Sequence, residues 1–169
     1  IGFMKEIIIA DVIKRELQAA GKQAKTVFIS DDYDPIRSFP PSLTLSPDEY
    51  MGVPYSDAPD PHGCCESLGA HWTSELAEAF PEFGADPEIV LQSELYKTKE
   101  MLDAVRTCLV NTETIREILI EYVARDFGEK QKSEYIESMK TWYPASVICP
   151  VCGRLQSGGK GSIVPNRVT

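Results

Sequence analysis

Residues 26–35 read TVFISDDYDP, an apolar strand pattern that ends in three carboxylates within four residues. In an open α/β sheet, ligands bind beyond the carboxyl ends of the strands, so Asp31, Asp32 and Asp34 would be well placed to meet an ammonium group or a metal ion. Aspartate is also common where a chain leaves a strand and turns into solvent. Taken alone, the run favours the solvated turn.

The composition is that of one globular domain with room for a small appendage. The chain has 169 residues, 43% of them hydrophobic, which is enough to build a core. Its 17 basic and 26 acidic residues give a net charge of -9, which argues against broad nucleic-acid binding, and we expect no DNA partner. No apolar run approaches the ~20 residues of a membrane span, so we expect no membrane partner. The odd number of cysteines, five, indicates a reducing compartment and predicts a cytoplasmic protein.

Hydrophobic periodicity predicts an α/β fold. A helix over residues 4–20 leads through Gly21 into a strand at 26–29, which is half of a βαβ unit. Residues 34–65 carry seven of the twelve prolines and are predicted to form a long loop that is either functional or mobile. The other predicted elements are a helix at 66–80, a strand at 87–92, and helices at 94–109, 113–127 and 130–140.

The strongest local motif is the run CPVCG at residues 149–153. Two thiolates three positions apart, followed by glycine, form a tight turn that can direct both sulfurs to one metal ion. Tetrahedral zinc needs four ligands, so Cys149 and Cys152 would supply half of a site. Ordinary thiols and a redox pair are the alternatives. The strand-like run before the motif favours zinc.

Residues 57–67 are dense in reactive side chains. His62, Cys64 and Glu66 could be ligands or acid–base groups. His62 could also activate Cys64 or Cys65 as a nucleophile, which would indicate a cysteine hydrolase. The simpler interpretation is a turn at Gly63 followed by cysteines that fill apolar space, and we prefer it. His71, on the predicted helix, is expected to be structural and not a metal ligand.

Two aromatic positions are weaker candidates for a ligand pocket. Tyr96 follows the predicted strand at 87–92, so it would lie at the same sheet edge as Asp31. Trp142 stands beside Tyr143, and adjacent rings can form the wall of a pocket. Helix capping and core packing are the simpler explanations of the two positions, and without further context we prefer them.

Read together, these motifs resemble the class I lysyl-tRNA synthetase family, the type found mainly in archaea. The resemblance is an ordered series that covers nearly the whole chain. The series comprises SDDYD at 30–34, PIR at 35–37, YMGVP at 50–54, DP at 60–61, GC at 63–64, ES at 66–67, SELYK at 93–97, WYPA at 142–145 and CP at 149–150.

This resemblance implies a partial Rossmann-like class I catalytic domain over residues 1–145, with an inserted helical and zinc-knuckle region whose knuckle part, residues 146–169, holds a half site. The family joins L-lysine to tRNA(Lys) through lysyl-adenylate, with ATP and its Mg²⁺ as substrate. Catalysis of this kind rests on positioning and charge stabilisation, so no catalytic residue is assigned.

The resemblance also implies roles for single residues. Asp31 would face the substrate α-ammonium, with Asp32 and Asp34 in support and with Tyr96 and Trp142 lining the pocket. Residues 1–3 look like the tail of a His-Ile-Gly-His-type signature, which would place Gly2 under the ATP phosphates.

Three departures from the family pattern leave other interpretations open. The first histidine of the signature and the Lys-Met-Ser-Lys-Ser-type loop are absent, and Cys65 stands where the family commonly has histidine. We therefore expect an internal piece of a longer enzyme that is inactive by itself. A non-catalytic RNA- or metal-binding paralogue is the alternative.

Overall fold

The computed structural model describes residues 2–155, and the chain divides into two compact units, Ile1–Lys97 and Thr98–Thr169. The sequence predicts a different division, at 145/146. The helices after Lys97 group with the cysteine-bearing segment and not with the strands. The functional division into residues 1–145 and 146–169 stays a prediction.

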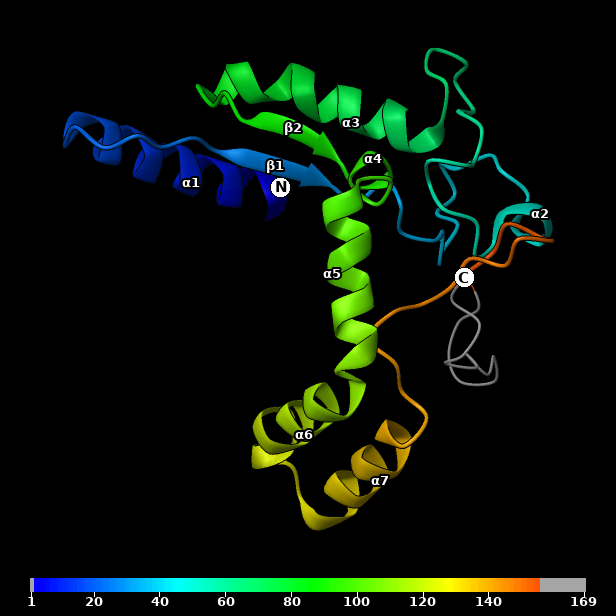
Figure 1. Cartoon of the computed structure of the whole chain (residues 1–169). Coiled ribbons are helices and arrows are strands. Elements are labelled where there is room, and N and C mark those ends of the chain that lie inside the picture. The colour runs from blue at the N-terminus through cyan, green and yellow to red at the C-terminus, as the bar shows by residue number, and fades with distance from the viewer. Residues whose placement is uncertain (1, 156–169) are drawn as a thin grey trace. The chain divides into compact units, whose positions relative to one another are not determined.

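The first unit is built on a parallel pair of strands, β1 (Val27–Ser30) and β2 (Glu88–Leu91), with Val27 opposite Glu88 and Ser30 opposite Leu91 (Figure 1). Parallel strands need a long crossover connection, which α3 provides. The predicted α/β fold is therefore confirmed for this unit. Its helices are α1 (Gly2–Ala19), α2 (Pro47–Tyr50), α3 (Leu68–Ala79), the 3-10 helix η1 (Phe80–Phe83) and α4 (Gln92–Leu95).

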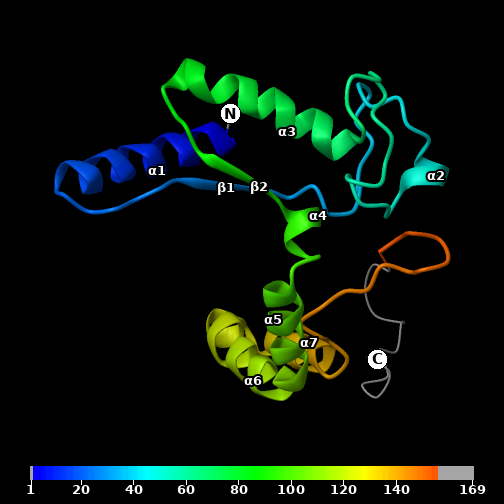
Figure 2. The same cartoon turned by 45° about the horizontal axis from the view of Figure 1, so that its top comes forward.

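A small apolar core joins the helices to one face of the strand pair. Ile7 of α1 and Phe80 of η1 are buried there, and the Phe28 ring of β1 meets the Phe80 ring edge-on at 5.4 Å. Figure 2 shows α1 and α3 on this side of the strands. Side chains alternate along a strand, so Val27 and Ile29 point to the other face, where both are exposed.

The proline-rich segment between β1 and α3 has a core of its own. Ile36 and Leu68 are almost completely buried and pack with Leu43 and Ala58. Backbone N–H groups of Ile36 and Gly52 hydrogen-bond across the segment, at 2.8 and 2.9 Å from their acceptors. The predicted long loop is present, but it is interrupted by the short helix α2 and is packed against α3.

The described part of the second unit, residues 98–155, contains three α-helices, α5 (Lys99–Val110), α6 (Thr112–Val123) and α7 (Glu129–Met139), with the 3-10 helix η2 (Ala124–Asp126) after α6. The Thr98 side chain caps α5 by accepting from the N–H of Met101, and α6 contacts both α5 and α7 (Figure 2). Near the end of the described chain, Ile148 and Leu155 form an isolated antiparallel bridge. All three helices were predicted from sequence, but the helix predicted at 94–109 is divided: residues 94 and 95 end α4, and α5 starts only after its N-cap Thr98. Among residues 2–155, no helix is long and apolar enough to cross a membrane.

Candidate functional site

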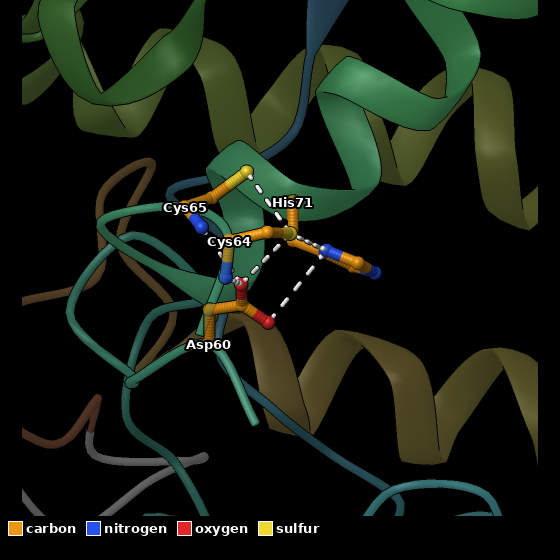
Figure 3. A group of neighbouring side chains, drawn as sticks. All are labelled: Asp60, Cys64, Cys65 and His71. Carbon is orange, nitrogen blue, oxygen red and sulfur yellow. Dashed lines mark hydrogen bonds and ion pairs between the residues drawn. The ribbon is translucent and has the colours of Figure 1, made fainter. Parts of the chain in front are cut away.

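Four potential metal ligands gather where the proline-rich segment meets α3. Asp60, Cys64, Cys65 and His71 place one donor atom each within 4.8 Å of one another (Figure 3). Three of the donors come from the loop, and His71 comes from the first turns of α3. Sequence alone favoured a packing role for these cysteines and a structural role for His71.

Local hydrogen bonds explain why the loop brings its donors together. The carboxylate of Asp60 accepts backbone N–H groups from His62, Cys64 and Cys65 at 2.8–2.9 Å. Gly63 supplies the turn between them with a φ of 69°, a conformation that side-chain-bearing residues rarely adopt. One buried carboxylate therefore orders the whole cysteine turn.

The helix start fixes the fourth donor. Ser67 caps α3 by accepting from the N–H of Ala70 at 3.1 Å, which is a standard way to satisfy a helix N-terminus. His71 then lies one turn into the helix, with its Nδ1 3.0 Å from the Cys64 sulfur and 3.6 Å from a carboxylate oxygen of Asp60.

Electrostatics also favour a cation at this position. Burial by itself would raise the pKa of Asp60, but the N–H groups of His62, Cys65 and Cys64 hold that pKa well below its ordinary value. Asp60 therefore keeps its negative charge although its side chain is fully buried. Buried charges are normally paired or bound to a metal. Two sulfurs, an imidazole nitrogen and a carboxylate oxygen are a donor set that zinc accepts.

The same geometry argues against the cysteine hydrolase. The hydrogen bond to Asp60, with a smaller contribution from Cys65, raises the pKa of Cys64 to about 11, whereas a nucleophilic cysteine needs a stabilised thiolate. His62, the base considered from sequence, stacks on His71 with ring centroids 4.7 Å apart. The packing interpretation also fails, because Cys64 is exposed and Cys65 only half-buried.

The three aspartates that follow β1 differ in burial and in hydrogen bonding. Asp31 is exposed at the carboxyl end of the strand, and Asp34 is exposed after a turn closed by its N–H and the carbonyl of Asp31. Asp32 is buried, and its two oxygens accept the backbone N–H and the hydroxyl of Ser93. Asp32 thus links the ends of β1 and β2, and only Asp31 and Asp34 present free carboxylates to solvent.

A cavity of about 300 Å³ opens beside this strand end, lined by Ser30, Asp31, Asp32, Gly69 and Trp72 among others. The wall of this cavity is closely packed at Gly69. A Cβ at this position would lie 2.9 Å from the Cβ of Asp32 and 3.2 Å from the backbone of Tyr55.

Two predicted ligand-pocket residues lie in different units of the chain. The Tyr96 ring is partly exposed and packs against Tyr33, which follows β1, with centroids 5.4 Å apart. This places Tyr96 beside the acidic strand end, as the sequence analysis expected. Trp142 belongs to the second unit, where its carbonyl accepts from the Arg116 guanidinium of α6.

The Cys149–Cys152 pair lies in a tight turn. The N–H of Gly153 donates to the Cys149 carbonyl at 2.8 Å, and Gly153 has a φ of 66°. Backbone N–H groups of Cys152 and Val151 lower the pKa of the Cys149 thiol, which favours the thiolate that a metal binds. Within residues 2–155 this pair does not belong to a group of three or more possible ligands. The rest of the predicted knuckle region, residues 156–169, lies outside the described residues.

Comparison with known proteins identifies the family. The profile of the family described as tRNA synthetases class I (K) matches residues 1–160. The chain belongs to the class I (K) tRNA synthetases. It is 35% identical to a protein of Methanosphaera stadtmanae named lysine--tRNA ligase, over 93% of this chain and 28% of the relative. Proteins of the same name from Methanocaldococcus jannaschii and Pyrococcus horikoshii are 31% and 29% identical, over 93% and 89% of this chain and 28% and 27% of the relatives.

This synthetase chain thus spans little more than a quarter of the length of the curated relatives it matches. The resemblance seen in the sequence is confirmed at the level of the family. The roles expected for Asp31, Asp32, Asp34, Tyr96, Trp142 and Gly2 stay predictions. Gly2 is the first residue of α1.

The four-ligand cluster has a weak signal in the sequence. Asp60 precedes a Gly-Cys-Cys run by three residues, and His71 follows seven residues after Cys64. Metal sites are usually recognised by paired Cys-x-x-Cys or His spacings, and this one contains neither. The helix start at Ser67 converts the irregular spacing into a compact cluster.

Proposed function

We propose that this chain is part of a lysine--tRNA ligase that uses ATP to form lysyl-adenylate and then transfers the lysyl group to tRNA(Lys). Family membership and the names of the relatives support this proposal. Its central observation is the exposed carboxylate of Asp31 at the carboxyl end of a parallel strand, held beside a buried link between β1 and β2. Such an edge is where open α/β sheets bind their ligands.

In this proposal, binding and orientation are the work of the described residues. Asp31 accepts hydrogen bonds from the α-ammonium group of lysine, and the Asp32–Ser93 link keeps the strand end rigid while it does so. A fixed carboxylate lowers the barrier by holding the amino acid in the orientation needed for attack on ATP. Tyr96 and Trp142 are each proposed to bind the amino acid, and Gly2, at the start of α1, to lie near the ATP phosphates. Mg²⁺ accompanies ATP.

We assign zinc to the cluster of Asp60, Cys64, Cys65 and His71, where it would join the proline-rich segment to α3. The donor set fits the ion, since four donors of the usual types converge around one buried charge. A site with four protein ligands is closed, which is typical of structural zinc. Cys149 and Cys152 are proposed as half of a second site.

We propose that the whole protein is located in the cytoplasm. Its thiols would remain reduced there, as both proposed zinc sites require. Its partners in this proposal are lysine, ATP and tRNA(Lys).

Lysine-dependent exchange between ATP and pyrophosphate, measured on the full-length protein, tests the proposed activity. We expect exchange with lysine, and Asp31→Ala should raise the lysine KM by roughly tenfold or more, since a charge-assisted hydrogen bond contributes about 1.5–3 kcal/mol. Asp86→Ala is the matched control, because Asp86 is an exposed carboxylate just before β2, at the opposite end of the strands. Exchange with another amino acid would refute the specificity. A lack of any exchange would favour a non-catalytic paralogue.

A further inference from the structure

We propose that Glu75 is the positioning residue of the metal centre: it holds the Nε2–H of His71, so that Nδ1 is the nitrogen that binds the ion. This inference rests on the zinc site proposed above and adds a residue outside the four ligands.

The two nitrogens of the His71 ring face different surroundings. Nδ1 points into the cluster, 3.0 Å from the Cys64 sulfur, whereas the other ring nitrogen points away from it (Figure 3). There Nε2 lies 3.5 Å from a carboxylate oxygen of Glu75, one helical turn further along α3. Glu75 is exposed, and a rotation of its side chain is needed to shorten this contact to the 2.7–3.2 Å of an N–H···O bond.

A neutral imidazole carries one N–H and one lone pair, and a metal ion needs the lone pair. A carboxylate at Nε2 favours the proton on that nitrogen and leaves the Nδ1 lone pair directed at the cluster. Metal-binding histidines almost always donate their second N–H to such a partner, which also fixes the ring orientation.

The ring is held on its face as well. His62 stacks on His71 at an interplanar angle of 15°, while its backbone N–H donates to Asp60. The orientation of His71 is therefore set by the loop on one face and by Glu75 at the ring edge. Because α3 places residues 71 and 75 one turn apart, the helix supplies both the ligand and its support.

The test uses the whole 169-residue chain, which has only two histidines, so their ring signals can be assigned with His62→Asn. Long-range ¹H–¹⁵N spectra of the zinc-loaded chain should show His71 with Nε2 protonated and Nδ1 bound to metal. Zinc affinity is measured in parallel by competition with a chromophoric chelator. Co²⁺ loading adds a spectrum that reports ligand geometry.

Three substitutions on α3 separate positioning from a general effect on the helix. Glu75→Ala should weaken zinc binding by roughly tenfold, at the lower end of what the loss of such a partner costs. Glu75→Gln, which keeps a carbonyl acceptor, should recover part of the loss and the wild-type Nε2–H signal. Glu78→Ala, another exposed acidic position of α3, should leave affinity and spectra unchanged.

The failures of the two proposals are distinguishable. If His71→Ala leaves the Co²⁺ spectrum and the zinc affinity unchanged, there is no metal centre at His71 and both proposals fall. If His71→Ala abolishes the site but Glu75→Ala binds zinc as tightly as wild type, the centre stands and the role of Glu75 is refuted. Metal on Nε2, with the proton on Nδ1, would refute it as well.

Discussion

At the scale of single residues, Gly69 is a position where α3 closely approaches the strand end. We expect Gly69→Ala to lower the free energy of unfolding by about 1–3 kcal/mol, because the added methyl group overpacks the wall formed by Asp32 and Tyr55. Urea unfolding measures the change. Gly128→Ala is the control: a Cβ there meets nothing within 4 Å, so only the N-cap preference is lost, below about 1 kcal/mol. Equal losses in the two variants would contradict this account of Gly69.

Single residues also show where sequence reasoning succeeded and where it stopped. The exposed Asp31 follows directly from the end of an apolar strand. The burial of Asp32 does not, because it depends on Ser93, which is 61 positions away. The metal cluster was not predicted from the sequence, for a related reason. Its donors converge only after Asp60 has collected three N–H groups and Ser67 has started α3, and spacing along the chain records neither event.

Two thiols of the chain should react at different pH in the metal-free protein. Hydrogen bonding to Asp60 raises the pKa of Cys64 to about 11, and backbone N–H groups lower the pKa of Cys149. Because the thiolate is the reactive form, iodoacetamide should label Cys149 at a lower pH than Cys64 as the pH is raised. Mass spectrometry of timed digests measures both rates. Labelling of Cys64 at the lower pH would show that the Asp60 contact is not formed.

At the scale of elements, the Asp32–Ser93 link fastens the carboxyl ends of β1 and β2. We expect Ser93→Ala to destabilise the protein by about 1–3 kcal/mol, because it leaves a buried carboxylate with one hydrogen bond fewer. The substitution should also raise the lysine KM, because Asp31 directly precedes Asp32, which would be held less firmly. Thermal unfolding and exchange kinetics measure the two effects. The exposed Ser42→Ala is the matched control, and an effect of the same size there would contradict the role of the link.

In the second unit, Arg116 fastens the segment around Trp142 to α6. Its guanidinium donates twice to the Trp142 carbonyl and lies 5.2 Å from the centre of the Tyr143 ring. Arg116→Ala should cost about 1.5–3 kcal/mol, the usual range for hydrogen bonds to a charged group. Arg106→Ala, which removes an exposed ion pair with Asp103, should cost less than about 1 kcal/mol.

Fluorescence separates the local effect from a global one. The chain has two tryptophans, so a Trp72→Phe background reports Trp142 alone. A shift of its emission in Arg116→Ala, under conditions where the helices remain folded, is the expected result. An unchanged emission together with unchanged stability would show that α6 does not hold the segment.

At the scale of the molecule, hydrophobic periodicity was sufficient to predict the α/β order of the first unit and the helical content of the described part of the second. It could not predict the division after Lys97, because this depends on which elements contact one another and not on where each begins. The exposure of Val27 and Ile29 also could not be predicted from periodicity. Their apolar character is that of a buried strand, yet both are exposed among the residues that the structure describes.

The proposed zinc ion should stabilise the contact between the proline-rich segment and α3 against local unfolding. Asp60 and two cysteines belong to the proline-rich segment and His71 to α3, so removing the ion should release the segment from the helix. Between residues 26 and 96 trypsin can cut only after Arg37, which follows the buried Ile36. We therefore expect chelation to accelerate cleavage at Arg37, by about tenfold for each 1.4 kcal/mol of local stability lost, because cleavage tracks the population of the open form.

Cleavage after Lys22, in the exposed turn before β1, serves as the internal reference and should keep its rate. His71→Ala should reproduce the faster cleavage at Arg37 without chelator and should make it insensitive to added zinc. This variant excludes the second proposed zinc site as the cause, since Cys149 and Cys152 remain intact in it. Equal protection of Arg37 with zinc, with chelator and in His71→Ala would mean that the segment is held by its apolar core of Ile36, Leu43 and Leu68 alone. The ion would then have no structural role in joining the segment to α3.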